Sequence, residues 1–216
     1  ASVPSGSAPP SSTGSPPTTA PSYDSMVIER VRAVVVCWNN ADLLDRCLEH
    51  LAATAWPGHL EVLVVDNGST DGSVARWADR HPDVRLVETG VNLGFAGGAN
   101  RGLRDRLDVD AVALVNSDAF VAPGWLDPLV AALDADPEVG AACPKILFAT
   151  PDDAGGARIN NVGNELGPRW EPHDRGYGEP DDGRYDRAED VWGWCGGGVL
   201  LRREYLDDVG LFDERL

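Results

Sequence analysis

The sequence predicts an α/β fold: a mostly parallel sheet flanked by helices, with a long irregular loop before the last elements. Three observations predict it. Short β-branched runs recur along the chain, they are predominantly apolar, and segments of helical period separate them. Such strands are typical of a sheet covered on both faces, and strand–helix alternation is typical of parallel order. With 216 residues, 43% of them hydrophobic, the chain can bury one sizeable core.

The chain divides near residue 25. Residues 1–25 consist largely of Pro, Ser, Thr, Gly and Ala, with almost nothing to bury, which predicts a disordered tail or linker. Residues 26–216 form the predicted domain. We expect its strands at 31–37, 60–66, 83–88, 110–116, 138–146 and 198–201.

Helices are expected between these strands. The first is capped by Asn39 or Asn40 and buries leucines of one face. The turn "NGSTDGS" supplies Ser69 or Asp71 as cap for the next. We expect the later helices over 74–81, around 100–107, over 123–136 and shortly after 201. Residues 152–190 are rich in Gly, Pro and Asp and predict a long loop with at most a small hairpin, of the kind that often has a function.

Charge and composition exclude several classes. The net charge is −17, so we expect no nucleic-acid partner, although a single nucleotide with a metal ion remains compatible. The four cysteines lack CxxC or zinc spacing and are interpreted as buried small hydrophobes in a reducing compartment. No membrane-spanning stretch or signal peptide is recognised. The chain starts at Ala, as a processed product or a piece of a longer protein would.

Two acids and a glycine-rich loop follow expected strands. Asp66 ends the second strand, Asp118 follows the fourth, and residues 90–102 follow the third. Ligands of open parallel sheets bind beyond the carboxyl ends of the strands, so these features predict a nucleotide-sized crevice. Mg²⁺ or Mn²⁺ would offset Asp118, whose burial unpaired would be costly. An equally good interpretation makes Asp118 a cap of the next helix or turn.

The glycine-rich stretch also nearly matches the phosphate loop of short-chain dehydrogenases. Gly97 falls one place late, the loop follows the third strand rather than the first, and no YxxxK motif follows. An NAD(P)-dependent oxidoreductase is therefore disfavoured.

Five motifs in order resemble a known family: "VVVCWNN", "LEVLVVDNGSTDGS", "NLGFAGGANRG", "ALVNSDA" and "GGGVLLRREYLDDVGLFDE". From Val31 onward the chain resembles family 2 glycosyltransferases of the GT-A (Rossmann-like) fold. Among these it looks most like bacterial rhamnosyltransferases that build cell-surface polysaccharides. The resemblance implies a cytoplasmic enzyme, either free or at the inner face of the cell membrane, that takes a nucleoside-diphosphate sugar and a glycan or lipid-linked acceptor. Helices in further C-terminal parts would allow membrane association.

The resemblance also implies residue roles. Asp118 would bind Mg²⁺ or Mn²⁺ in the "NSD" stretch, where Asn116 replaces the first acid of the family's DxD motif. The floor near the sugar and acceptor would contain Trp192, Trp194, Gly196 and Gly197; core packing is as good an interpretation for at least one of the tryptophans. The residues implied to line the nucleotide pocket are Cys37, Trp38, Asn39, Asp66, Gly94, Asn100 and Asn116.

The implied reaction is inverting sugar transfer, in which a carboxylate base takes the acceptor proton. In the family this base lies beyond the "FDE" stretch that Asp213 and Glu214 match, so it is expected beyond Leu216 and the chain as given is expected to transfer sugar poorly. The donor expected first is dTDP-rhamnose; UDP-galactofuranose, UDP-glucose and UDP-N-acetylglucosamine suit the same chemistry. The alternative is a non-catalytic nucleotide- or carbohydrate-binding relative.

Overall fold

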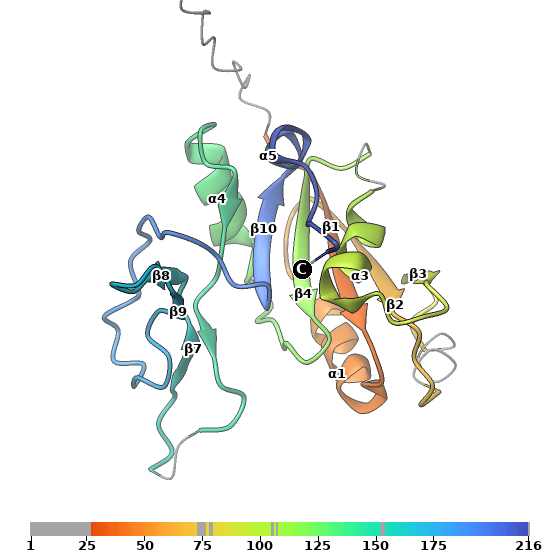
Figure 1. Ribbon diagram of the computed structural model, residues 1–216, viewed down its shortest axis with the longest axis horizontal. Coiled ribbons are helices and arrows are strands. Elements are labelled where there is room, and N and C mark those ends of the chain that lie inside the picture. The colour runs from red at the N-terminus through yellow and green to blue at the C-terminus, as the bar shows by residue number, and fades with distance from the viewer. Residues whose placement is uncertain are drawn as a thin grey trace, which may run out of the picture.

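A six-stranded sheet forms the centre of the computed structural model, which describes residues 27–72, 77, 80–104, 106, 108–151 and 154–215. The strand order is β3-β2-β1-β4-β10-β5 (Figure 1). The first four strands in that order run parallel, and β10 runs antiparallel to β4. The expected mostly parallel α/β sheet is confirmed. Its strands are β1 (Arg30–Cys37), β2 (His59–Asp66), β3 (Arg85–Glu88), β4 (Ala111–Asn116), β5 (Ala141–Ala142) and β10 (Gly198–Arg202).

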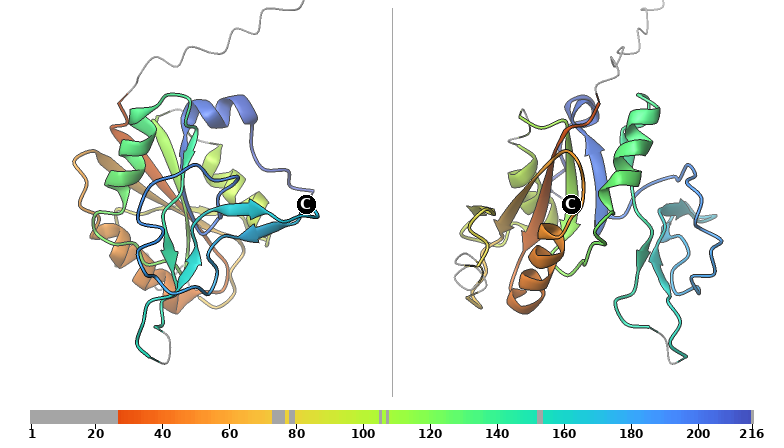
Figure 2. Two further views of the ribbon diagram at one scale, coloured as in Figure 1. Left: turned by 90° about the vertical axis from the view of Figure 1, so that its left-hand side faces the viewer. Right: turned by 180° about the vertical axis from the view of Figure 1, so that it is seen from behind.

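Helices cover both faces of the sheet, so the strands are apolar on both sides (Figures 1 and 2). On one face, α1 (Ala41–Ala52) and α4 (Leu126–Ala135) pack their leucines against the alternate β1 residues Val31, Ala33 and Val35. On the other face, Leu103 of α3 (Gly94–Leu103) and Leu206 of α5 (Arg203–Val209) pack with Val34. This accounts for the largely apolar runs in the sequence.

The glycine-rich stretch forms most of α3, whereas the sequence predicted a loop leading into a later helix. The reason is how closely α3 approaches β1. A Cβ atom on Gly98 would lie 2.7 Å from Val36 Cγ1, and one on Gly102 would lie 2.3 Å from Val34 Cγ1. Two of the glycines are therefore packing residues of a helix pressed onto the sheet.

The expected strand over 138–146 is wrong in extent. Only Ala141 and Ala142 pair with β10. Pro144 follows, cannot donate to a ladder, and the chain then leaves the sheet. The next strand, β6 (Ile146–Leu147), pairs instead with β7 (Ile159–Asn161).

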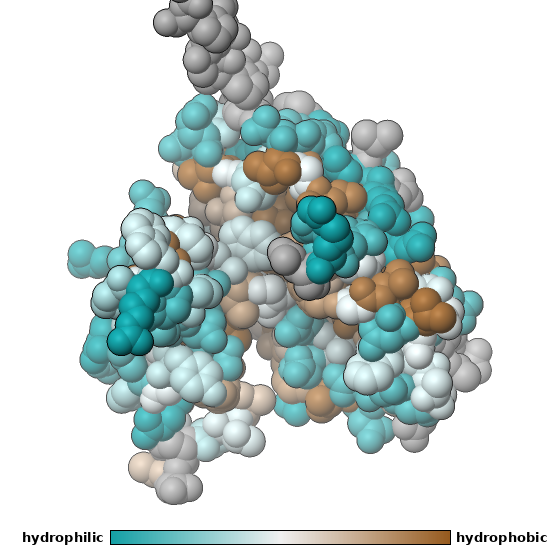
Figure 3. Space-filling view, in the orientation of Figure 1, coloured by the Kyte–Doolittle hydropathy of each residue, from teal (hydrophilic) through white to brown (hydrophobic). Residues whose placement is uncertain are grey.

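Residues 146–151 and 154–192 form a lobe beside the sheet, beyond α4 (Figure 2). Besides β6 and β7 it contains the hairpin of β8 (Asn164–Leu166) and β9 (Pro172–Asp174), which exceeds the single small hairpin expected. Lys145 ties the later loop to the base of the lobe, because its Nζ atom donates to Asp181 at 2.7 Å and to Asp186 at 2.5 Å. The surface is hollowed between this lobe and the main body (Figure 3).

Some expectations fall outside the described residues: the tail at 1–25, most of the 74–81 helix and residue 216. Asn40 occupies the N-cap position of α1 but makes no side-chain capping bond. Asp71 accepts a hydrogen bond from the Ala41 amide at 3.2 Å, and the start of the helix that it was expected to cap lies outside the described residues. Within the described ranges, every helix is too short or too polar to cross a bilayer.

Candidate functional site: the carboxyl edge of the sheet

The carboxyl ends of β1, β2 and β4 meet at one edge of the sheet. Cys37 lies opposite Asp66, and Val36 lies opposite Asn116. Asp66 is 6% exposed. Its Oδ1 atom accepts from the Ser69 amide at 3.0 Å. The edge thus places a buried carboxylate at the end of β2 and a half-buried amide at the end of β4, on either side of β1.

The loops that follow β1 and β2 are fixed to each other by hydrogen bonds. The Asn67 amide donates to the Cys37 carbonyl at 2.8 Å. The Asn39 amide donates to Ser69 Oγ at 3.1 Å, and the Thr70 amide donates to Asn39 Oδ1 at 2.8 Å. Asn39 adopts a positive φ of 51°, which asparagine tolerates better than most residues. These hydrogen bonds join the two loops into one rim at the carboxyl edge of the sheet.

Trp38 offers an aromatic surface in this rim, since the residue is 55% exposed. Cys37 is buried, and burial raises the pKa of its thiol, with a further rise from the Asp66 charge. Cys47 is also buried, whereas Cys143 and Cys195 are half-buried. The expectation of buried cysteines therefore holds for two of the four.

The loop after β3 is held by Asn67, which sequence reasoning missed. Asn67 is 2% exposed. Its Nδ2 atom donates to the Gly94 carbonyl at 3.0 Å and to Asn92 Oδ1 at 3.1 Å, and its Oδ1 atom accepts from the Leu93 amide at 3.0 Å. Gly94, at φ 72°, also donates its amide to Asn92 Oδ1 at 2.8 Å. The signal was an asparagine directly after a strand-ending acid.

Asp118 corrects an expectation. The sequence suggested a buried carboxylate, but Asp118 is exposed and lies in the turn after β4. Among the described residues its carboxylate has no hydrogen bond or ion pair, and α4 begins without a side-chain cap. Asp118 therefore does not cap the next helix. Burial raises the pKa of the nearby Cys47 thiol to about 12, and the Asp118 charge contributes to that rise.

Asn116 presents its side chain toward the glycines of the next segment. The backbone amide of Asn116 donates to the Gly197 carbonyl at 3.3 Å, and its backbone carbonyl accepts from the Ala119 amide at 3.0 Å. A Cβ atom on Gly197 would lie 3.7 Å from Asn116 Nδ2. Both backbone groups of Asn116 are thus hydrogen-bonded, whereas its side-chain amide donates no hydrogen bond to the described residues.

The side chains at this edge suit a cation that takes most of its ligands from phosphate and water rather than from the protein. Within the part of the chain that the structure describes, no three His, Cys, Asp or Glu side chains cluster to hold a metal. Mg²⁺ is often held by one or two carboxylates, with phosphate and water oxygens completing its shell. The unpartnered carboxylate of Asp118 fits that arrangement, and Asn116 adds an amide beside it.

The two tryptophans of "WGWCGGG" differ in environment. Trp192 is 64% exposed, whereas Trp194 packs against the core cluster beneath α3 and contacts the ring of Phe212 edge-on, with centroids 6.0 Å apart. The core interpretation therefore holds for Trp194. A Cβ atom on Gly196 would lie 3.1 Å from the end of the Phe95 ring, so this glycine lets the floor approach the start of α3.

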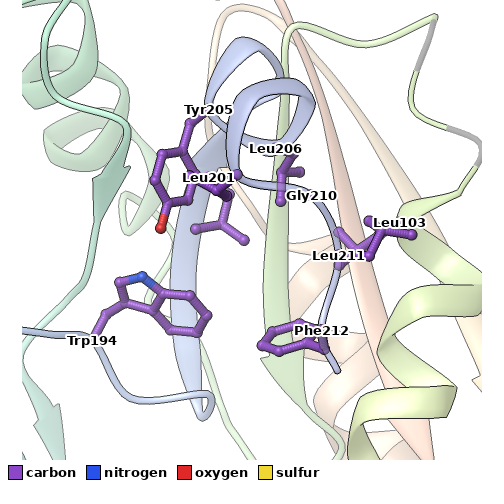
Figure 4. Close-up of a pocket in the computed structure, with 9 residues that line it drawn as sticks. Leu103, Trp194, Leu201, Tyr205, Leu206, Gly210, Leu211 and Phe212 are labelled. Atoms are coloured by element: carbon purple, nitrogen blue, oxygen red, sulfur yellow. The ribbon is translucent and has the colours of Figure 1, made fainter. Parts of the chain in front are cut away.

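Asn100 has other partners than a nucleotide. Its Nδ2 atom donates to the Phe212 carbonyl at 2.9 Å and to Glu214 Oε1 at 2.8 Å, and its Oδ1 atom accepts from the Phe212 amide at 3.0 Å. Both amide protons of Asn100 therefore have acceptors within the chain, and its expected place beside the nucleotide stays a prediction. A pocket of about 170 Å³ lies beside this contact, with Trp194 and Phe212 at one end and Tyr205 and Leu206 at the other (Figure 4).

Comparisons with known proteins identify the family and the fold of the chain. The glycosyl transferase family 2 model matches residues 33–210. An N-acetylglucosaminyl-diphospho-decaprenol L-rhamnosyltransferase of Mycobacterium tuberculosis is 33% identical over 204 residues, covering 84% of this chain and 64% of the relative. The chain thus spans about two thirds of that relative's length.

Two solved structures share the fold. A mannosyltransferase of Pyrobaculum calidifontis, in complex with GDP-Man and Mn²⁺, superposes with a TM-score of 0.58 at 28% identity, over 89% of this chain and 50% of the other. GalNAc-T7 with UDP, GalNAc and Mn²⁺ gives a TM-score of 0.65 at 16% identity, over 87% and 38% of the two chains. The expected GT-A architecture is confirmed, and the chain belongs to glycosyl transferase family 2.

Proposed function

We propose that the carboxyl edge of the sheet binds a nucleoside-diphosphate sugar with a divalent cation and serves an inverting sugar transfer. The observation that carries the proposal is Asp118: an exposed carboxylate at this edge, without a partner among the described residues. A charge in that position is available for a ligand. The mannosyltransferase of similar fold holds GDP-Man and Mn²⁺, which supports the same ligand class here.

Each side of the edge has a distinct part in the proposal. On the β1 side of the rim, Cys37, Trp38 and Asn39 hold the nucleobase, with the exposed Trp38 ring as a stacking surface. Asp66 faces the base or ribose. Asp118 holds Mg²⁺ or Mn²⁺ on the diphosphate, where such an ion stabilises the charge of a departing nucleoside diphosphate. The Asn116 amide donates to the ribose or phosphate.

The sugar and its acceptor belong on the floor that follows. Trp192 is exposed and offers an aromatic face to sugar C–H groups, while Gly196 and Gly197 leave room beside Phe95 and Asn116. We propose a lipid-linked glycan as acceptor and dTDP-rhamnose as donor, because a relative at 33% identity is a rhamnosyltransferase whose substrate is N-acetylglucosaminyl-diphospho-decaprenol.

Calorimetry tests the proposal. The chain is titrated with dTDP and with UDP, with and without Mn²⁺, and the titrations are repeated on Asp118→Asn and on a control, Asp127→Asn, which changes an acid in the first turn of α4. We expect manganese-dependent binding of one nucleotide, weakened at least about tenfold by Asp118→Asn and unchanged by the control. Equal binding by all three proteins would refute the role of Asp118; no binding under any condition would favour the non-catalytic alternative.

A further inference from the structure

The contact between α3 and the segment Leu211–Glu214 joins the two sides of the candidate site. Asn100 grips this segment through both its amide protons and its carbonyl oxygen: the backbone of Phe212 is held in both directions, and Glu214 is held through its side chain. Arg104, one turn further along, donates to the same Glu214 oxygen at 2.8 Å. Two hydrogen bonds to the backbone of one residue, with an ion pair beside them, fix the position of that residue.

The helix that carries Asn100 cannot shift easily. Gly98 and Gly102 lie one turn apart on the side of α3 that touches β1, where Val36 and Val34 leave no space for a Cβ atom. Asn100 is only 2% exposed, and its saturated side chain has no donor left for a ligand. Its position is thereby set by the sheet, and the position of Phe212 is set by Asn100.

Phe212 lies between two rings that belong to different parts of the site. Its ring is 5.9 Å, centroid to centroid, from Phe95 at the start of α3 and 6.0 Å from Trp194 in the floor segment, both edge-on. The Phe95 ring in turn packs against Gly196. The close-up shows Trp194 and Phe212 at the same end of the pocket that they help to line (Figure 4). Three aromatic rings thus link the loop beside the nucleotide rim to the proposed sugar floor.

We propose that Asn100 is a positioning residue: it docks the segment Leu211–Glu214 so that Phe212 holds Phe95 and the Trp194–Gly197 floor in register for the sugar of the donor. The inference rests on the proposed function for the identity of the ligand. It assigns Asn100 to the sugar side of the site, through Phe212, and removes it from direct contact with the nucleotide.

Two measurements on Asn100→Ala test this. Hydrogen exchange followed by mass spectrometry reports on residues 207–215, and calorimetry with Mn²⁺ compares dTDP with dTDP-rhamnose. We expect exchange at Phe212 and its neighbours to accelerate about tenfold, because the amide loses its acceptor. We expect the affinity for dTDP-rhamnose to fall at least about fivefold and the affinity for dTDP to change less than twofold. Arg101→Ala, an exposed neighbour on α3, is the matched control and should change neither.

Glu214→Ala provides a second variant should Asn100→Ala not fold, because Glu214 is 44% exposed at its side chain and supplies one of the three hydrogen bonds. It should shift both measurements in the same direction by smaller factors. Unchanged exchange in a folded variant would overturn the docking. A fall in dTDP affinity equal to the fall for dTDP-rhamnose would overturn the positioning role and return Asn100 to the nucleotide. Failure of the wild-type chain to bind either probe would refute the proposed function instead, while the exchange experiment still decides the docking.

Discussion

Substituting Gly102 by alanine should destabilise the protein although alanine is the better helix former. The new methyl carbon would lie 2.3 Å from Val34 Cγ1 and 2.9 Å from Val34 Cγ2, and Val34 is 1% exposed on a central strand, so it cannot withdraw. Overpacking of this kind costs about 1–3 kcal/mol, and such a short contact belongs at about 3 kcal/mol. Alanine returns about 1 kcal/mol of helix propensity, which leaves a net loss of about 2 kcal/mol.

Urea unfolding measures this loss, and a double-mutant cycle tests its cause. In Gly102→Ala the transition midpoint should fall at unchanged slope. In a Val34→Ala background, which removes both clashing methyl groups, the same glycine substitution should no longer destabilise, so that the two changes couple by at least about 1 kcal/mol. A Gly102→Ala protein as stable as wild type, or an equal loss in both backgrounds, would refute the close-packing explanation of the glycine-rich helix.

Two further predictions concern the floor and the far end of the sheet. Trp192→Ala should leave the free energy of unfolding within about 0.5 kcal/mol of the wild-type value, because the residue is 64% exposed. The same substitution should weaken binding of the nucleotide sugar. Trp194→Ala should cost about 2 kcal/mol in urea unfolding through lost packing; equal losses would contradict the assignment. Burial alone would raise the pKa of Glu61, but hydrogen bonds from Arg85 and Arg32 outweigh it and hold the pKa of that carboxyl below its usual value. Its stabilisation is present above the ordinary pKa and is lost as pH falls through the lowered one, so wild type should lose stability below about pH 4.5 and Glu61→Gln should lose less over that interval; parallel pH profiles would contradict this.

Parallel strands were predictable because burial on both faces leaves an unmistakable apolar run. β1, β2 and β4 agree with the predicted strands to within a residue or two. Arg32 interrupts the first run with a charge, and the strand tolerates it because Arg32, fully buried, pairs with Glu61 and Asp108. These two partners lie 29 and 76 positions further along the chain than Arg32, so no local sequence pattern could reveal the compensation.

The candidate site was predictable in position and less so in detail. Strand ends point to Asp66 and Asp118 from the sequence alone, since the carboxyl ends of parallel strands share an edge. The exposure of Asp118 depends on the turn after β4, and the partners of Asn100 lie 112 and 114 residues further along the chain. Periodicity cannot reveal contacts of that range. The prediction for the glycines of α3 was wrong for the same reason. Close packing against Val34 and Val36 requires glycine there, and both valines are distant in sequence.

A crystal of the chain grown with Mn²⁺ and a nucleoside diphosphate would test the central claim most directly. Data collected at the manganese absorption edge locate the ion without reference to the protein. The account predicts an anomalous peak about 2.1 Å from an Asp118 carboxylate oxygen, with the diphosphate on its far side and the base against Trp38. A fully occupied manganese site elsewhere, or a nucleotide bound away from the carboxyl ends of β1, β2 and β4, would contradict it.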